Sequence, residues 1–250
     1  MKNNNKFRLD VWGAITLGTI ALYALFLLYP MAYLIRQSVL DPDTGGFTLA
    51  YFTKFFSKSY YFDTLINSFK VSITATVLSI AIGTPLAYLF TIFKIKGKSV
   101  LNILIVVASM SAPFIGAYSW ILLLGRSGVI TAFFKNLGIA IPDIYGFGGI
   151  VLVMTLQLFP LVFLYAKGAL KNIDNSLIEA AENLGCSGIA CFFKVVVPLI
   201  MPTLLAAALL VFMRSFADFG TPMLIGEGYR TFPVVLYTEF INEVGGSDGF

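Results

Sequence analysis

Side chains that could carry out chemistry are few in this chain of 250 residues, and histidine is absent altogether. Histidine is the most frequent general base near neutral pH and the most frequent metal ligand, so much of enzyme catalysis is excluded. The two cysteines, Cys186 and Cys191, lack the second pair or the histidines that a zinc site needs. We therefore expect no enzyme activity, no metal site and no cofactor bound by this chain.

One short segment has the ending of a phosphate-binding loop, Gly97-Lys98-Ser99. Such a loop needs another glycine five positions before Gly97, where the chain has Ile92. We interpret the segment as a tight turn between two membrane helices. Any ATP that drives this protein must then be bound by a partner subunit.

Two ionisable residues, Arg214 and Asp218, lie in an apolar run, where a charge is costly and is therefore a candidate functional group. Four residues apart on a helix, they would share a face and could pair. The pattern leaves two roles open, the lining of a solute path and a structural ion pair. Further candidates for the path are polar side chains of neighbouring apolar runs, which serve helix packing at least as often: Ser72, Thr76, Ser111 and Gln157.

The elements that must position these residues are predicted to be membrane helices. Apolar residues make up 58% of the chain and charged residues only 12%, which is too much apolar surface for one water-soluble core. A helix needs about 20 apolar residues to cross the bilayer. The sequence predicts an all-α membrane protein with about five spans, Val11–Ile35, Val71–Phe93, Val100–Leu124, Gly149–Ala166 and Leu199–Thr221.

The end of the chain does not complete this pattern. The last six residues, from Gly245 on, are predicted to form no closing helix. We expect either an odd number of spans or a chain that stops before its natural end, with a sixth span missing. Within the second span, Gly83-Thr84-Pro85 predicts a local break of the helix.

Basic residues predict the orientation in the membrane. Lysines gather in segment 94–98 and between residues 167 and 194, whereas most acidic residues fall in the other connections. The positive-inside rule then places the N-terminus and both lysine-rich connections in the cytoplasm, in a multi-pass protein of the inner membrane surrounded by lipid. The basic residues form no continuous face, so no nucleic-acid partner is expected. Outside, Phe47–Phe62 is predicted as an interfacial helix and 125–147 as a turn-rich loop.

The connection between the fourth and fifth spans, Lys167 to Pro198, is the most informative segment. Ser176 followed by Glu179 is the pattern of a capping box and predicts a short helix that ends at Gly185. A second short helix is predicted from residue 187 to 194. Two small helices separated by a glycine bend would therefore lie on the cytoplasmic face.

This connection resembles the EAA motif of permeases of binding-protein-dependent ABC importers, which reads E-A-A-x3-G-x9-I-x-L-P. The chain has Glu179-Ala180-Ala181, Gly185 and Pro198 in register, and departs only by Val195 for isoleucine and Val197 for leucine. The resemblance covers about residues 67–250 as a type I ABC permease domain. It leaves residues 1–66 as an N-terminal anchor helix with an extracytoplasmic loop.

The resemblance implies a coupling helix that docks in a groove of a separate ATPase subunit and transmits its closure to the membrane helices. The implied coupling residues are Glu179, Ala180, Ala181, Glu182, Gly185 and Pro198. The implied partners are a cytoplasmic ABC ATPase dimer, an extracytoplasmic solute-binding protein and a second permease half or chain. The alternative is a capped surface helix without a coupling role.

The stretch from Ser215 to Pro233 resembles permeases of ferric-iron importers, many of which carry two permease halves in one chain. Ferric iron is the solute that this resemblance implies. Related systems take up phosphonates, sugar phosphates, polyamines and thiamine, and these alternatives stay open. A channel would need no coupling loop, and a membrane-embedded enzyme using Asp218 would lack a second intramembrane carboxylate.

Overall fold

The computed structural model describes residues 11–41, 45–93, 96–110, 112–139, 142–186 and 188–244. Throughout these ranges the regular structure is helical, and the one β feature is an isolated bridge between Leu40 and Phe47. The chain divides into two compact units, Met1–Phe62 and Asp63–Phe250, which are described separately below.

The first unit is built around one long apolar helix. It consists of α1 (Val11–Tyr23), a π-helical turn (Ala24–Leu28) and α2 (Tyr29–Ser38), and it is followed by α3 (Ala50–Ser57). The π turn ends just before Pro30, which has no N–H to donate to the carbonyl four residues earlier. None of the residues of α1 and α2 is buried within the unit, as expected for an apolar helix that faces lipid on all sides.

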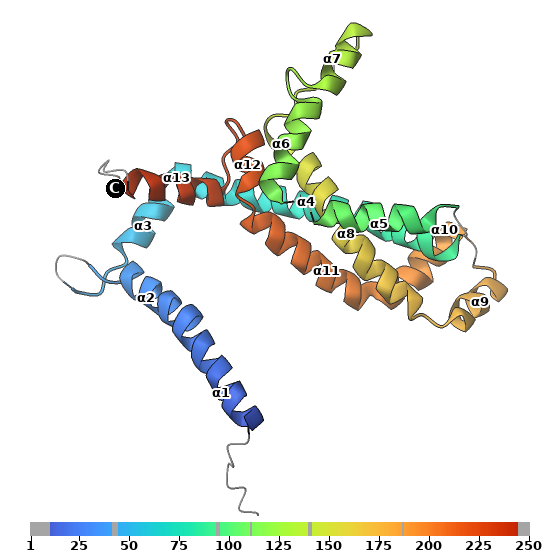
Figure 1. Cartoon of the computed structure of the whole chain (residues 1–250), viewed down its shortest axis with the longest axis horizontal. Coiled ribbons are helices and arrows are strands. Elements are labelled where there is room, and N and C mark those ends of the chain that lie inside the picture. The colour runs from blue at the N-terminus through green and yellow to red at the C-terminus, as the bar shows by residue number, and fades with distance from the viewer. Residues whose placement is uncertain are drawn as a thin grey trace, which may run out of the picture. The chain divides into compact units, whose positions relative to one another are not determined.

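The second unit contains the remaining helices, which Figure 1 shows in colours from cyan to red. Its first half comprises α4 (Ser59–Ile92, in this unit from Asp63 on), α5 (Lys98–Ser109), α6 (Pro113–Leu124), α7 (Val129–Asn136) and α8 (Phe147–Lys171). Its second half comprises α9 (Asn175–Asn183), α10 (Gly188–Cys191), a π-helical turn (Phe192–Val196), α11 (Val197–Ala217), α12 (Gly220–Ile225) and α13 (Phe232–Val244).

Helices α4, α8 and α11 supply most of the packed interior. One apolar cluster includes Phe90 of α4, Phe163 of α8 and Ile200 of α11. A second cluster includes Ala117 of α6 and Ile225 of α12. The first cluster extends along α11 as far as Val211, whereas the second joins α6 and α12 to α4 and α8.

Within the described ranges, five helical segments are long and apolar enough to cross a membrane, which confirms the predicted all-α membrane fold. They are Val11–Ser38, Ser59–Ile92, Phe114–Asn136, Phe147–Lys171 and Gly188–Phe216. The predicted third span, Val100–Leu124, is wrong as one helix, because the chain breaks between α5 and α6. Pro113 explains the break, since the residue before a proline avoids the helical region and Ala112 is extended, with ψ 142°.

Three further predictions need correction. The expected break at Gly83-Thr84-Pro85 does not occur, and α4 continues to Ile92 with Pro85 inside it. The loop 125–147 contains α7, and α13 was not predicted at all. The interfacial helix expected over Phe47–Phe62 is divided at Lys58, between α3 and the start of α4. The expectation for residues 245–250 lies outside the described residues.

Candidate functional site

The first part of the candidate site is α9 and the bend that follows it. Asp174 Oδ1 accepts a hydrogen bond from the backbone N–H of Ser176 at 2.9 Å, and this bond lowers the pKa of the Asp174 carboxyl. The helix therefore begins at Asn175, and Asp174 is the capping residue in place of the predicted Ser176. The predicted short helix is confirmed, with its capping residue two positions earlier than predicted.

Gly185 closes α9 in the way its sequence position predicts. Its φ is +85°, in the left-handed region that glycine occupies without strain. The N–H of Cys186 donates to the carbonyl of Ala181 at 3.0 Å, which is the long bond of a Schellman motif. The glycine of the EAA pattern thus ends the helix and turns the chain.

Several side chains of α9 are exposed, and two of its central residues are small alanines. Glu179 and Ala180 are exposed and Ala181 is half-buried, whereas the side chain of Glu182 is outside the described set. Around the bend, three large apolar side chains are exposed: Leu184 at 89%, Ile189 at 78% and Phe193 at 63%. Exposed apolar side chains beside a helix with small exposed residues are typical of a surface that a partner covers.

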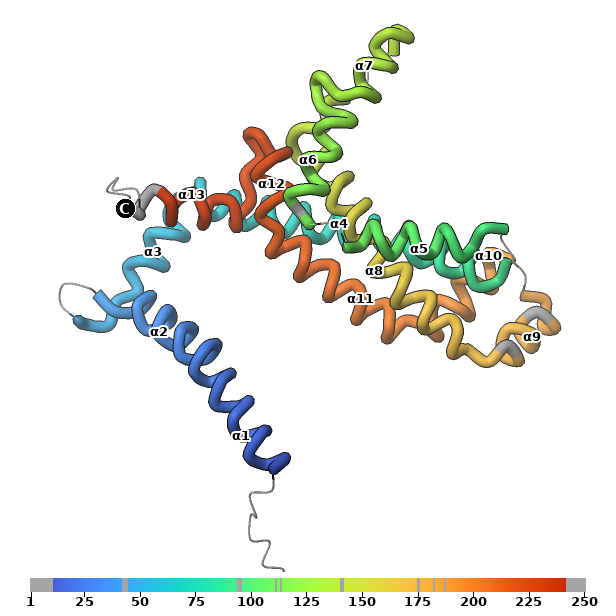
Figure 2. The backbone as a smooth tube through the Cα atoms, viewed as in Figure 1, coloured from blue at the N-terminus to red at the C-terminus, as the bar shows by residue number. Residues whose placement is uncertain are grey.

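The segment after the bend differs from the prediction of a second short helix. Helical structure runs without interruption from Gly188 through α10, the π turn and α11 to Ala217. The π turn is a consequence of Pro198 near the start of α11. Pro198 has no N–H to donate to the carbonyl four residues before it. The backbone hydrogen bonds before it therefore change from the α-helical to the π-helical spacing, and the N–H of Val197 donates to the carbonyl of Phe192, five residues back. Figure 2 shows the backbone passing from α8 through α9 into this long helix.

The second part of the candidate site is a cavity near the opposite end of α11. Its volume is about 490 Å³, and its lining comes from α5, α6, α8, α11 and the start of α12: Ser109, Phe114, Gln157, Leu158, Arg214, Ala217, Asp218, Phe219 and Gly220. Three of the predicted path residues, Arg214, Asp218 and Gln157, therefore come together. Ser72 and Thr76 do not line this cavity and are instead buried within the helix packing. Ser111 lies outside the described residues.

Arg214 and Asp218 do not form the predicted helical pair. Helix α11 ends at Ala217, and Asp218 has an extended backbone with ψ 122°. Asp218 Oδ1 instead accepts hydrogen bonds from the N–H groups of Gly220 at 2.9 Å and Thr221 at 3.4 Å. The carboxylate thus caps α12, and within the described part of the chain no ion pair involves Arg214.

The cavity lining also contains two polar side chains, Gln157 and Ser109, among apolar ones. The Nε2 of Gln157 is buried and has no hydrogen-bond partner among the described residues. The Ser109 hydroxyl donates its hydrogen to Val106 O at 2.6 Å, so it is not free to donate a hydrogen bond into the cavity. The start of α12 approaches α6 closely, and a Cβ at Gly220 would lie 3.3 Å from the Phe114 ring.

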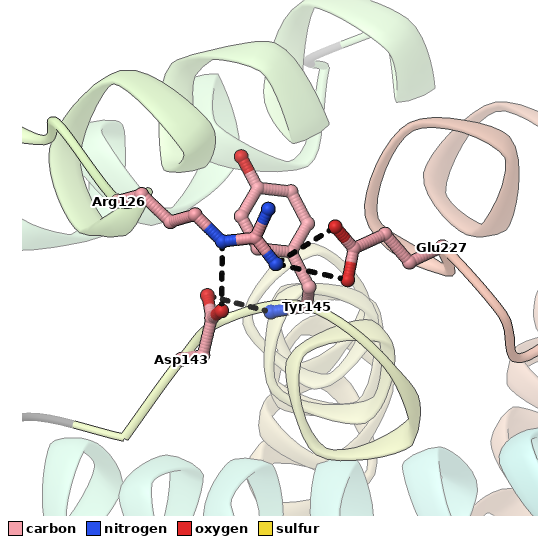
Figure 3. A network of polar contacts seen from close by, with 4 residues as sticks. All are labelled: Arg126, Asp143, Tyr145 and Glu227. Atoms are coloured by element: carbon pink, nitrogen blue, oxygen red, sulfur yellow. Dashed lines mark hydrogen bonds and ion pairs between the residues drawn. The ribbon is translucent and has the colours of Figure 1, made fainter.

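A charged network near the α12 end was missed by sequence reasoning. Arg126 Nε contacts Asp143 Oδ2 at 3.1 Å, and its Nη2 contacts the two carboxylate oxygens of Glu227 at 2.8 and 3.1 Å. The guanidinium also lies 4.8 Å from the centre of the Tyr145 ring (Figure 3). One side chain thus joins the connections after α6, before α8 and after α12. The only sequence signal is that these opposite charges fall in connections predicted to share one membrane face.

Comparisons with known proteins agree with this architecture. A profile of the family described as binding-protein-dependent transport system inner membrane component matches residues 79–244. Solved structures of a bacterial ABC transporter that imports alginate superpose with TM-scores of 0.71 and 0.75 at 17% identity, and the second match covers 95% of this chain and 84% of that one. At that identity, the likeness shows a shared fold.

Curated relatives have two different solutes in their names. The ferric transport system permease FbpB of Actinobacillus pleuropneumoniae is 28% identical over 240 residues, which are 95% of this chain and 34% of that protein. The spermidine/putrescine permease PotB of Haemophilus influenzae is 28% identical over 232 residues, which are 89% of this chain and 79% of that protein. The chain thus spans about a third of the length of its ferric relative.

Proposed function

Because the chain belongs to the family of inner-membrane components of binding-protein-dependent transport systems, we propose that it is a permease subunit of an ATP-driven ABC importer. In this proposal the N-terminus and α9 face the cytoplasm, and the α12 end of α11 faces outward. The solute comes from an extracytoplasmic binding protein, and ATP is bound by a separate ATPase dimer. A second permease half completes the path, as in a double-length or paired arrangement.

The observation that carries the proposal is the continuous helix from Gly188 to Ala217, which begins three residues after the bend at Gly185. At 1.5 Å per residue, this helix connects the bend with Arg214 over about 40 Å. A movement imposed on α9 would therefore reach the cavity through a rigid element instead of through a loop.

The surface of α9 supports a docking role. Glu179 and Ala180 are exposed, so a partner groove could approach the helix backbone closely. The apolar side chain of Leu184, which lies at the bend and outside the candidate span Gly188–Phe216, would be removed from water by the same contact.

Ferric iron is the proposed solute, and a polyamine is the second candidate. The names of the curated relatives favour both equally, since FbpB and PotB are each 28% identical to this chain. The expected solute-binding partner is supported by the alginate transporter, whose structure includes a periplasmic protein that holds an alginate pentasaccharide.

The coupling role is tested by adding bulk to the exposed face of α9. Ala180→Trp keeps the helix, because the position is exposed, but fills the space that a close docking groove needs. We expect the ATPase subunit to co-purify with the wild-type permease and to be lost, or uncoupled from uptake, in this variant. Asn136→Trp at the exposed end of α7 is the matched control. Equal ATPase retention and equal uptake in the two variants would contradict the proposal.

A further inference from the structure

The cavity at the α12 end of α11 contains a guanidinium, that of Arg214, with no ion-pair partner among the described residues. Arg214 lies in the candidate membrane span Gly188–Phe216, where a charged side chain needs a partner. No acidic side chain in the described residues pairs with it. The one carboxylate in the described cavity lining, that of Asp218, makes its hydrogen bonds to the N–H groups of Gly220 and Thr221 through Oδ1.

A second group in the same cavity points to the same chemistry. The Nε2 of Gln157 is buried and without a partner, which leaves two N–H donors with nothing to bind. A buried donor of this kind costs free energy until an acceptor arrives. The cavity therefore combines a guanidinium and an amide N–H₂ against walls formed by Phe114, Leu158 and Phe219.

We propose that this cavity binds an anionic group of the transported solute, a carboxylate or a phosphate, through Arg214 and Gln157. The guanidinium presents a planar fork of donors that matches such an anion with two parallel hydrogen bonds. This inference rests on the proposed function, because it assigns the cavity to the solute path. It narrows the solute to one that carries negative charge.

The assignment separates the two solute classes of the relatives. A polyamine or a bare ferric ion would meet the Arg214 charge and would find a single carboxylate in the described lining, that of Asp218, whose Oδ1 already accepts two N–H groups. A ferric complex with carboxylate or phosphate ligands would present its oxygens to the donors. The volume of about 490 Å³ is sufficient for a small solute of this kind.

The test measures thermal unfolding of the purified, assembled transporter with sodium citrate, sodium phosphate or spermidine chloride at equal ionic strength. Citrate and phosphate also stabilise proteins by exclusion from their surface, so the readout is the difference between wild type and Arg214→Gln. Lys70→Gln removes one charge from an exposed position of α4 that lies outside the cavity lining, and serves as the control. We expect the wild type and the control to show an anion-dependent rise in midpoint that Arg214→Gln loses.

Arg214→Lys should retain part of this rise, since it keeps the charge but not the fork. With the anion that the wild type binds, the apparent affinity should fall about tenfold or more in Arg214→Gln. Equal responses in wild type and Arg214→Gln would overturn the proposal, as would a specific rise with spermidine.

A further outcome would also overturn it. If Arg214→Gln lowers the midpoint without any anion and no anion-dependent difference exists, the guanidinium pairs with an acid of a neighbouring chain. These results are independent of the Ala180→Trp experiment. Failure of the anion site therefore leaves the coupling role of α9 intact, and failure of ATPase coupling is recognised separately.

Discussion

Gly83 lies at a close approach between α4 and α8, and a side chain at this position should push the two helices apart. A Cβ at this position would lie 2.9 Å from Phe159 O and 2.9 Å from Val162 Cβ, which is nearer than real Cβ atoms come. Overpacking of this kind costs about 1–3 kcal/mol. Replacing a helical glycine by alanine otherwise gains about 0.5–1 kcal/mol. The net effect of Gly83→Ala is then a loss of up to about 2.5 kcal/mol of stability, and a loss of about 1–3 kcal/mol relative to an unobstructed Gly→Ala change.

Gly168→Ala is the matched control for this prediction. Gly168 is an exposed residue of α8, and no heavy atom lies within 4 Å of a Cβ placed there. The same chemical change should therefore stabilise the protein by about 0.5–1 kcal/mol. Equilibrium unfolding in mixed micelles of increasing SDS content, followed by far-UV circular dichroism, compares the two variants. A Gly83→Ala protein as stable as Gly168→Ala would refute the packing of α4 on α8.

Three further predictions concern the two ends of the second unit. In Gly185→Ala the added Cβ meets no neighbouring atom, but alanine must adopt the left-handed backbone at φ +85°. This strain should cost about 1–2 kcal/mol and speed amide exchange in the last turn of α9. Arg126→Gln should lower the unfolding midpoint at low salt and leave it unchanged at about 1 M salt, because exposed ion pairs are screened, and an equal effect in both would contradict this. The hydrogen bond from the Ser176 N–H lowers the pKa of the Asp174 carboxyl. The Asp174 carboxylate therefore stabilises α9 fully above the unfolded pKa near 3.9, and this stabilisation is lost as pH falls through the folded pKa. Asp174→Asn should remove this acid dependence, which amide exchange in α9 measures.

The sequence was sufficient to predict the elements whose signal is local. A long apolar run reports a membrane helix by itself, and the end of α9 at Gly185 is a property of a few neighbouring residues. The break between α5 and α6 was also present in the sequence, as Pro113, but the apolar run across it concealed the stop. Local signals also misled at Pro85, which lies inside the uninterrupted α4, and at Ser176, where Asp174 is the capping residue.

What could not be predicted depends on contacts between distant residues. The continuity of α10 with α11 depends on a π turn that accommodates Pro198. In the sequence alone, Pro198 predicts the start of a new helix. Asp218 was expected to pair with Arg214 because four-residue spacing was read as helical. The chain instead leaves the helix at Ala217, where α12 packs against α6. The network around Arg126 joins residues up to 101 positions apart, which no spacing rule detects.

The central claim is that α9 is the surface on which an ATPase subunit docks. It is tested most directly by a photo-crosslinking amino acid placed at position 180 of α9 or, as the comparison, at position 228 in the exposed connection after α12. In membranes that contain the complete transporter, the account predicts a crosslink to the ATPase subunit from position 180 and none from position 228. A crosslink from position 228, or none from position 180 while the ATPase co-purifies, would contradict it.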